Sequence, residues 1–222
     1  MEEIAKIIDH TALAAEAGAG AITRLCGEAK EYGFRSVVVQ PCRVSLAVEA
    51  LSGSGIPVGT VAGFPFGAAE TEIKAKEASL AIGRGATEID MVINVGWIKD
   101  GRWEQVAADI REVGEACRSR GPDRKVILKV IIEACLLTDD EKGRAAAVVK
   151  EAGADYVKTS TGYLGPGANP RDVALMRKAV GPGFGIKASG GIRTLAQAKE
   201  LLNAGADIIG TSAGAAIMNE HV

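Results

Sequence analysis

Short runs of aliphatic and β-branched residues recur along the chain and are separated by longer segments in which apolar residues have helical spacing. The runs are almost continuously apolar, which is typical of parallel strands that are buried on both faces. This pattern predicts eight strands, of which the first is the least regular, over residues 7–10, 36–39, 58–61, 89–93, 126–132, 155–158, 185–188 and 207–209.

The segments between these runs predict amphipathic helices. In segment 103–117, apolar side chains recur every three or four residues while the opposite face carries charged residues. Thr138 and Glu141 have the spacing of a capping box, and Asn169 followed by Pro170 is typical of a helix start.

Strands that alternate with helices in a chain of 222 residues predict an α/β fold, a single (β/α)8 TIM barrel domain over 1–222. No stretch has the composition of a linker, so a second domain is not predicted. An open, doubly wound sheet is the structural alternative, because strand closure cannot be read from the spacing of the runs.

Charge and composition exclude several classes of function. Lys and Arg total 26 against 28 Asp and Glu, without a basic stripe, and aromatic residues make up 4% of the chain, so nucleic-acid binding is not expected. The N-terminus is acidic and no apolar run has the length of a membrane span, which predicts a cytoplasmic protein. Four cysteines without CxxC spacing predict reduced thiols, and two histidines leave little material for a metal site.

Three lysines, Lys129, Lys158 and Lys187, lie within or at the ends of predicted strands. A buried amine is costly to desolvate, so it is paired, neutralised or used chemically; the alternative is that each one reaches the barrel mouth and forms an ordinary ion pair. Adjacent strands are about 4.8 Å apart, so Lys158 and Lys187 are expected to lower each other's pKa, as Schiff-base chemistry requires. Either lysine could be the nucleophile on this reasoning.

Asp90 shares one face of its predicted strand with Glu88, Val92 and Asn94. If that face points inward, Asp90 meets the lysines and can relay protons during carbon–carbon bond cleavage. The alternative role is a purely structural ion-pair partner of Lys129 or Lys187.

The loops after the last two predicted strands, 189–193 and 210–214, predict a phosphate site. Barrels often bind phosphate at this position. Glycines let backbone amides approach an anion, hydroxyl groups donate further hydrogen bonds, and a following helix start adds favourable potential.

Several motifs together resemble the deoxyribose-phosphate aldolase family over nearly the whole chain. They include Lys158-Thr159-Ser160-Thr161-Gly162, Lys187-Ala188-Ser189-Gly190-Gly191-Ile192-Arg193, Glu88-Ile89-Asp90-Met91-Val92-Ile93-Asn94, Gly63-Phe64-Pro65-Phe66-Gly67, Leu128-Lys129-Val130-Ile131-Ile132-Glu133, Ile8-Asp9-His10-Thr11 and Ile209-Gly210-Thr211-Ser212. The resemblance implies reversible cleavage of 2-deoxy-D-ribose 5-phosphate to D-glyceraldehyde 3-phosphate and acetaldehyde, without metal or organic cofactor, by a homo-oligomer.

The resemblance also implies roles for individual residues. Lys158 matches the Schiff-base lysine, Lys187 the lysine that lowers its pKa, and Asp90 the proton-relay aspartate. Cys42 matches a cysteine at the pocket edge. Substrate or phosphate contacts are expected at Asp9, Thr11, Lys129, Thr161, Gly162, Gly190, Gly191, Arg193, Gly210 and Ser212.

The chain departs from the family pattern at Ala213, where a second serine is common, and at Tyr163-Leu164. It also lacks a longer tail ending in tyrosine after His221, so proton return is expected to depend on water and Asp90. Two other interpretations stay open: a pyridoxal-phosphate enzyme with an internal Schiff base, and a sugar-phosphate sensor without catalysis.

Overall fold

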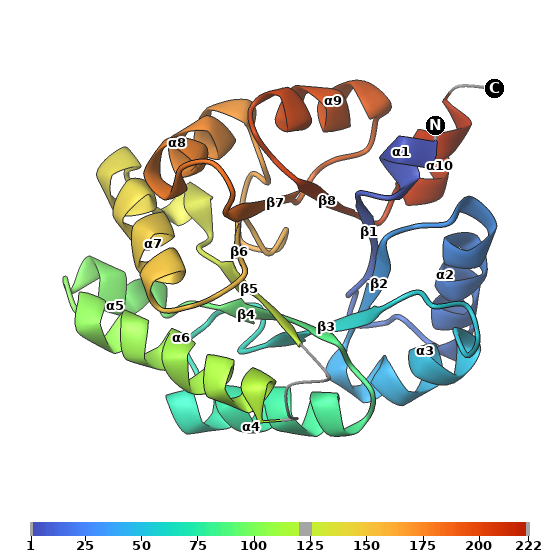
Figure 1. Ribbon diagram of the computed structural model, residues 1–222, viewed down its shortest axis with the longest axis horizontal. Helices are drawn as coiled ribbons and strands as arrows, with labels where there is room; N and C mark the ends of the chain where they lie inside the picture. The colour runs from blue at the N-terminus through green and yellow to red at the C-terminus, as the bar shows by residue number, and fades with distance from the viewer. Residues whose placement is uncertain (1, 120–125, 221–222) are drawn as a thin grey trace.

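The strands close into a parallel barrel in the order β1 to β8. The computed structural model describes residues 2–119 and 126–220, and within these ranges the sheet has no free edge (Figure 1). The barrel closes where Ile8 and Asp9 pair with Ile209 and Gly210. The TIM barrel prediction is therefore confirmed over the open sheet. The strands are β1 (Ile8–Ala12), β2 (Ser36–Val39), β3 (Val58–Ala62), β4 (Glu88–Val92), β5 (Ile127–Ile131), β6 (Tyr156–Lys158), β7 (Gly185–Ser189) and β8 (Ile208–Thr211).

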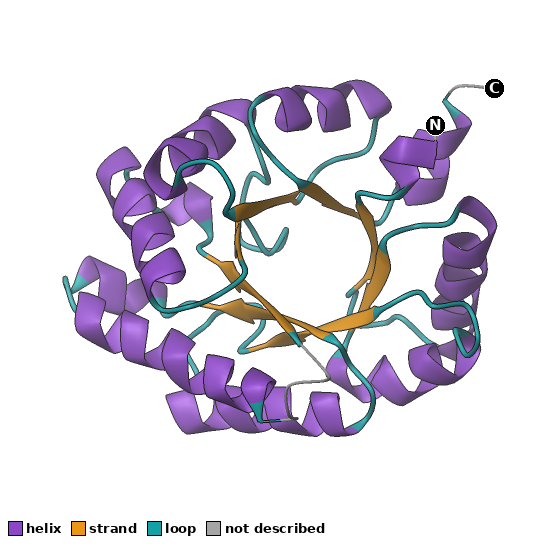
Figure 2. Cartoon of the chain, in the orientation of Figure 1, coloured by secondary structure: helices purple, strands orange, loops and turns teal. Residues whose placement is uncertain are grey.

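Helices surround the barrel on its outer side (Figure 2). The predicted capping box is present at α7, with both Thr138 and Glu141 side chains bonded to backbone amides. Asn169 caps α8, which has Pro170 in its first turn. The helices are α1 (Glu2–Ala5), α2 (Ala19–Tyr32), α3 (Val44–Ala50), α4 (Thr71–Gly83), α5 (Val95–Lys99), α6 (Trp103–Arg118), α7 (Asp139–Glu151), α8 (Pro170–Val180), α9 (Leu195–Asn203) and α10 (Gly214–Asn219), with 3-10 turns η1 (Pro41–Arg43) and η2 (Ala134–Leu136).

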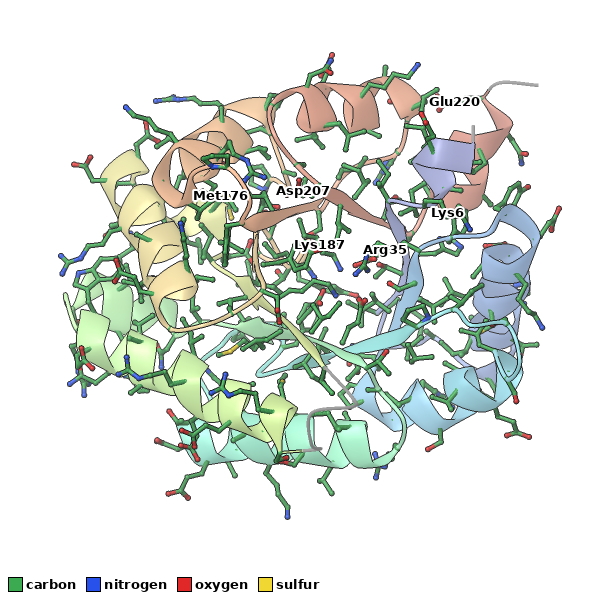
Figure 3. All side chains as sticks on the ribbon, viewed as in Figure 1. Lys6, Arg35, Met176, Lys187, Asp207 and Glu220 are labelled. Carbon is green, nitrogen blue, oxygen red and sulfur yellow. The ribbon has the colours of Figure 1, made fainter. Side chains whose placement is uncertain are left out.

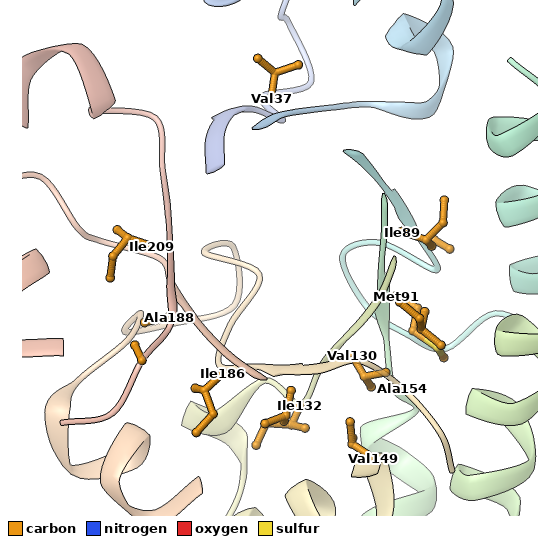
Figure 4. Close-up of a cluster of buried hydrophobic side chains, with 14 of the residues drawn as sticks. Val37, Ile89, Met91, Val130, Ile132, Val149, Ala154, Ile186, Ala188 and Ile209 are labelled. Carbon is orange, nitrogen blue, oxygen red and sulfur yellow. The ribbon is translucent and has the colours of Figure 1, made fainter. Parts of the chain in front are cut away.

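The main hydrophobic core lies between the barrel and its helices. Outward-facing strand residues such as Ile89, Val130 and Ile186 pack there (Figure 4). The apolar stripe predicted on α6 is buried in this core, while Trp103 at its start is partly buried and lies 4.4 Å below the guanidinium of Arg144. Burial of one face of each helix fixes the helices around the sheet.

The interior of the barrel has an apolar side and a charged side. Leu13, Val38 and Val61 form a small separate apolar cluster with Phe64 packed against it. Strands β1, β4, β5, β6 and β7 instead contribute buried ionisable residues to the interior, namely Asp9, Glu88, Asp90, Lys129, Lys158 and Lys187. None of the helices in the described ranges has both the length and the apolar composition needed to span a bilayer.

Candidate active site

A pocket of about 620 Å³ opens at the carboxyl ends of the strands. Its wall is formed mainly by β1 and its following loop, α2, and the ends and loops of β6, β7 and β8. Ten of the residues singled out from the sequence line it: Thr11, Lys158, Thr161, Gly162, Lys187, Gly190, Gly191, Arg193, Gly210 and Ser212. The structure thus brings the two lysines and both predicted phosphate loops to one cavity.

Lys158 and Lys187 lie directly opposite each other on β6 and β7. Both side chains are almost fully buried. Both ammonium nitrogens donate to Oδ2 of Asp90, each at 2.7 Å. The predicted meeting of two amines and one carboxylate at the barrel mouth is therefore present in the structure.

Below this trio, two further predicted residues form a second layer. Lys129 donates to Oδ1 of Asp90 at 2.8 Å and to Oε2 of Glu88 at 2.6 Å. Asp9 accepts hydrogen bonds from Lys187 at 2.6 Å and from the Ser36 hydroxyl at 2.7 Å. Asp9, Asp90 and Lys129 are completely buried and are not part of the pocket wall, so the structure places Asp9 and Lys129 where they hold the lysines and not where the pocket is lined.

Arg35 extends this arrangement to the amino end of the barrel. It directly precedes β2, and its guanidinium donates to Oδ1 of Asp9 at 2.5 Å and to both carboxylate oxygens of Glu88 at 2.7 and 3.0 Å. Figure 3 shows Arg35 and Lys187 directed toward the middle of the barrel. Arg35 was not predicted as a site residue from the sequence, because a charged residue before a strand is usually solvated. We call the seven connected residues the buried ion cluster: Asp9, Arg35, Glu88, Asp90, Lys129, Lys158 and Lys187.

The environment lowers the pKa of Lys158 to about 8. Burial is the largest cause; repulsion from Lys187 and Lys129 acts in the same direction, and Asp90 opposes them. The expected effect of Lys187 is therefore present but smaller than that of burial. At pH 7 about one molecule in ten then carries a neutral Lys158 amine, against fewer than about one in a thousand for an ordinary lysine.

Asp9 and Asp90 remain ionised. Burial alone would raise the pKa of Asp90, but Lys129, Lys158 and Lys187 together hold it well below its usual value. Burial likewise opposes ionisation of Asp9, whose pKa is lowered by Lys187, Lys129 and Arg35. An ionised Asp90 can only accept hydrogen bonds, so it suits the role of a proton acceptor through water.

Glu133, a further buried carboxylate beside the pocket, was not predicted as a site residue from the sequence. It follows β5 and has left-handed backbone angles, φ 49° and ψ 64°, which are rare outside glycine. Its Oε2 accepts hydrogen bonds from the Thr161 amide at 3.1 Å and the Thr161 hydroxyl at 2.5 Å. The only signal in the sequence is an acid directly after an apolar strand, and its partner lies 28 residues away.

The predicted phosphate loops have the backbone geometry that glycine permits. Gly190 and Gly191 have φ of 92° and 73°, in the left-handed region. Gly210 has a different reason to be glycine, since a Cβ there would lie 2.8 Å from Cε of Lys187. It therefore leaves room for a lysine of the cluster as well as for an anion.

The helix start after the first of these loops is already capped by protein groups. The amides of Arg193 and Thr194 donate to the Gln197 side chain, and the amide of Leu195 donates to Glu220. The prediction of a phosphate site therefore rests mainly on the glycine loop and less on the first turn of α9.

Two positions differ from the family-based expectation. Cys42 is exposed in η1 and does not line the pocket. Tyr163, one of the departures noted above, lines the pocket wall and makes an edge-on contact with Phe64 at 5.3 Å between ring centres. His221, which precedes the expected missing tail, is outside the described residues.

Comparisons with known proteins find relatives over nearly the whole chain. The model of the DeoC/LacD family aldolases matches residues 4–220. Deoxyribose-phosphate aldolase of Geobacillus sp. is 54% identical over 215 residues, which cover 97% of this chain and 94% of the relative. That of Clostridium perfringens is 50% identical, covering 100% and 96%. The structure of deoxyribose phosphate aldolase from Aeropyrum pernix superposes with a TM-score of 0.92 at 34% identity, covering 100% of this chain and 92% of the other.

Proposed function

The chain belongs to the DeoC/LacD aldolase family, and from this premise we propose that it cleaves 2-deoxy-D-ribose 5-phosphate reversibly through a Schiff base on Lys158. The products are D-glyceraldehyde 3-phosphate and acetaldehyde. The observation that carries the proposal is the pair of facing lysines on one aspartate oxygen, with the pKa of Lys158 lowered to about 8.

Lys158 is assigned as the nucleophile over Lys187. Burial and its two lysine neighbours favour the neutral form of Lys158. Lys187 instead donates hydrogen bonds to two carboxylates, Asp9 and Asp90, whereas Lys158 donates to Asp90 alone.

The reaction begins when the neutral Lys158 amine attacks the aldehyde carbon of the open-chain sugar. Loss of water gives a protonated imine, which accepts the electron pair when the bond between C2 and C3 breaks. The C3 hydroxyl loses its proton through water to Asp90 and becomes the aldehyde of glyceraldehyde 3-phosphate. Protonation of the enamine and hydrolysis then release acetaldehyde and restore the Lys158 amine. The imine itself is the electron sink, so this scheme requires no metal or organic cofactor.

The remaining pocket residues hold the substrate. We assign phosphate binding to Gly190, Gly191, Gly210 and Ser212, which line the pocket together with Arg193. Thr11, Thr161 and Gly162 line the same pocket as Lys158 and are assigned to contact the sugar. Fixing the phosphate sets the distance of the sugar aldehyde from the amine.

Borohydride reduction in the presence of acetaldehyde, followed by peptide mapping, tests the assignment. We expect an ethyl group on Lys158, and none at this position in a Lys158→Ala variant. Labelling of Lys187 or another lysine instead would refute it. A colourless protein that turns over deoxyribose phosphate would separate the proposal from both a pyridoxal-phosphate enzyme and a non-catalytic sensor.

We also infer a cytoplasmic homo-oligomer. All four cysteines are free thiols, which suits a reducing compartment. The Aeropyrum pernix relative is described as tetrameric. Phe66, Ile73 and Leu80 expose large apolar side chains on α4 and the loop before it, a composition that suits contact between copies. Light scattering of the purified protein measures the mass of the assembly.

A further inference from the structure

We propose that Arg35 is a positioning residue: it gives the buried ion cluster one more basic group than it has carboxylates, and this excess favours the neutral form of Lys158. The inference rests on the proposed function, because it assigns to Arg35 the tuning of the proposed nucleophile. Arg35 lies at the amino end of the barrel and is not part of the pocket wall.

The buried ion cluster contains more basic groups than carboxylates. Its carboxylates are Asp9, Glu88 and Asp90, three in number, and its basic groups are Arg35, Lys129, Lys158 and Lys187, four in number. If all four bases were protonated, this largely buried cluster would hold one uncompensated positive charge, which is costly. The cluster is neutral when one base releases its proton.

The hydrogen-bond partners of the four bases decide which one releases its proton. A guanidinium keeps its proton at any accessible pH, so Arg35 is always charged. Lys129 bonds to Glu88 and Asp90, and these carboxylates raise its pKa against the effect of burial. Lys187 bonds to Asp9 and Asp90. Lys158 bonds to a single carboxylate, Asp90, and it shares that oxygen with Lys187. The amine with the weakest compensation is therefore Lys158.

Arg35 acts on Lys158 through the carboxylates that it contacts at the amino end of the barrel. It occupies one oxygen of Asp9 and both oxygens of Glu88. These two carboxylates consequently have less negative charge to share with Lys187 and Lys129. Without Arg35, three bases would face three carboxylates, and all three lysines could stay protonated.

Other charges near Lys158 in the described part of the chain form no ion pair with the cluster; among them, buried Glu133 after β5 accepts hydrogen bonds from Thr161. From the surrounding strands Lys158 faces Asp90 on β4, Lys129 on β5 and Lys187 on β7, all members of the cluster. On the pocket wall above, Glu16, Arg24 and Arg193 are exposed and screened by water. His10 is paired with Glu28 at 2.6 Å.

The test compares pH profiles of wild type and an Arg35→Met variant between about pH 6 and about pH 10. We expect the acidic limb of kcat/KM for deoxyribose phosphate cleavage to move up by roughly one pH unit, because loss of a nearby cation raises the pKa of Lys158. Activity at pH 7 then falls about tenfold and recovers near pH 10. In Arg35→Lys, which keeps the charge, the acidic limb stays in place whatever the absolute rate.

A second variant, which should shift the acidic limb in the opposite direction, tests the proposal even if Arg35→Met does not fold. Glu88→Gln removes a carboxylate, increases the excess of bases to two and should move the acidic limb to lower pH. The double variant Arg35→Met/Glu88→Gln restores an excess of one and should regain the wild-type position. Equal loss at every pH, or shifts of the two single variants in the same direction, would overturn the proposal.

The pH dependence of acetaldehyde trapping on Lys158 by borohydride gives a second readout. It reports the amine directly and does not need the sugar phosphate. If the wild type failed to cleave deoxyribose phosphate, the proposed function would fall, while an unchanged trapping profile in Arg35→Met would by itself refute the role of Arg35.

Discussion

Lys74 and Lys158 are both buried lysines bonded to an aspartate, but their surroundings differ. Lys74 on α4 donates to Asp109 on α6 at 2.6 Å and to the Val92 carbonyl at 3.0 Å, with no exposed surface on either charged side chain. Burial lowers the pKa of Lys74 as well, against the opposing effect of Asp109. The ammonium of Lys74 bonds to one carboxylate, that of Asp109, and Glu77 nearby acts on its pKa in the same direction; the pair lies outside the pocket wall.

The difference shows that burial of a lysine alone does not make it reactive. Lys158 shares its carboxylate oxygen with a second lysine, belongs to a cluster with excess basic groups and lines a pocket. Lys74 has a carboxylate of its own and ties α4 and α6 to the end of β4, two residues beyond Asp90. We infer that Lys74 stabilises the scaffold, whereas Lys158 performs chemistry.

Replacement of the nucleophile has the largest expected effect. Lys158→Ala should reduce kcat for deoxyribose phosphate cleavage by more than about a thousandfold, since no imine can form at this position. Steady-state kinetics measure the loss, with Lys74→Met as the matched buried-lysine control. Activity within tenfold of wild type in Lys158→Ala would place the nucleophile elsewhere.

Removal of the neighbouring lysine should have a smaller and pH-dependent effect. Lys187→Leu leaves three bases against three carboxylates, so the pKa of Lys158 should rise from about 8 toward its ordinary value. Less neutral amine is then present at pH 7, and kcat/KM should fall by about tenfold or more, with recovery as the pH approaches 10. A loss of the same size at every pH would show that Lys187 has another role.

Replacement of Glu133, the buried carboxylate beside the pocket, should have a milder effect on catalysis. Glu133→Ala removes both hydrogen bonds that hold Thr161, which at about 1 kcal/mol each should raise KM about tenfold or more with a smaller change in kcat. Glu133→Gln keeps an acceptor oxygen of the same reach and should largely restore KM. A fall in kcat at unchanged KM would contradict a role in holding the substrate wall.

The smallest effect on turnover is expected for Lys74. Lys74→Met leaves the Asp109 charge buried without its partner, which should cost about 3–5 kcal/mol of unfolding free energy. Denaturant unfolding measures this loss, and the pH profile of the folded enzyme should not move. The double variant Lys74→Met/Asp109→Leu should regain most of the stability. A shifted pH profile in Lys74→Met would remove the distinction between the two lysines.

The sequence by itself determined the elements and the principal chemistry. Apolar periodicity located the eight strands and the buried stripe of α6, because each strand and helix has a repeat that shows in the local order of residues. Charged residues inside apolar runs identified Lys129, Lys158, Lys187 and Asp90, since a buried charge requires a partner or a use. The motifs indicated the family that the comparisons confirm.

The tertiary structure decided how these residues meet. Closure of the barrel brings Asp9 to Lys187 across 178 residues of sequence, and the register of β6 and β7 sets Lys158 opposite Lys187. It also placed Asp9 and Lys129 beneath the pocket. It brought Arg35 to Asp9 and Glu133 to Thr161, although the local sequence around Arg35 and Glu133 does not predict these contacts. Charge balance in a buried cluster depends on all of its members at once, and only the folded chain fixes that membership.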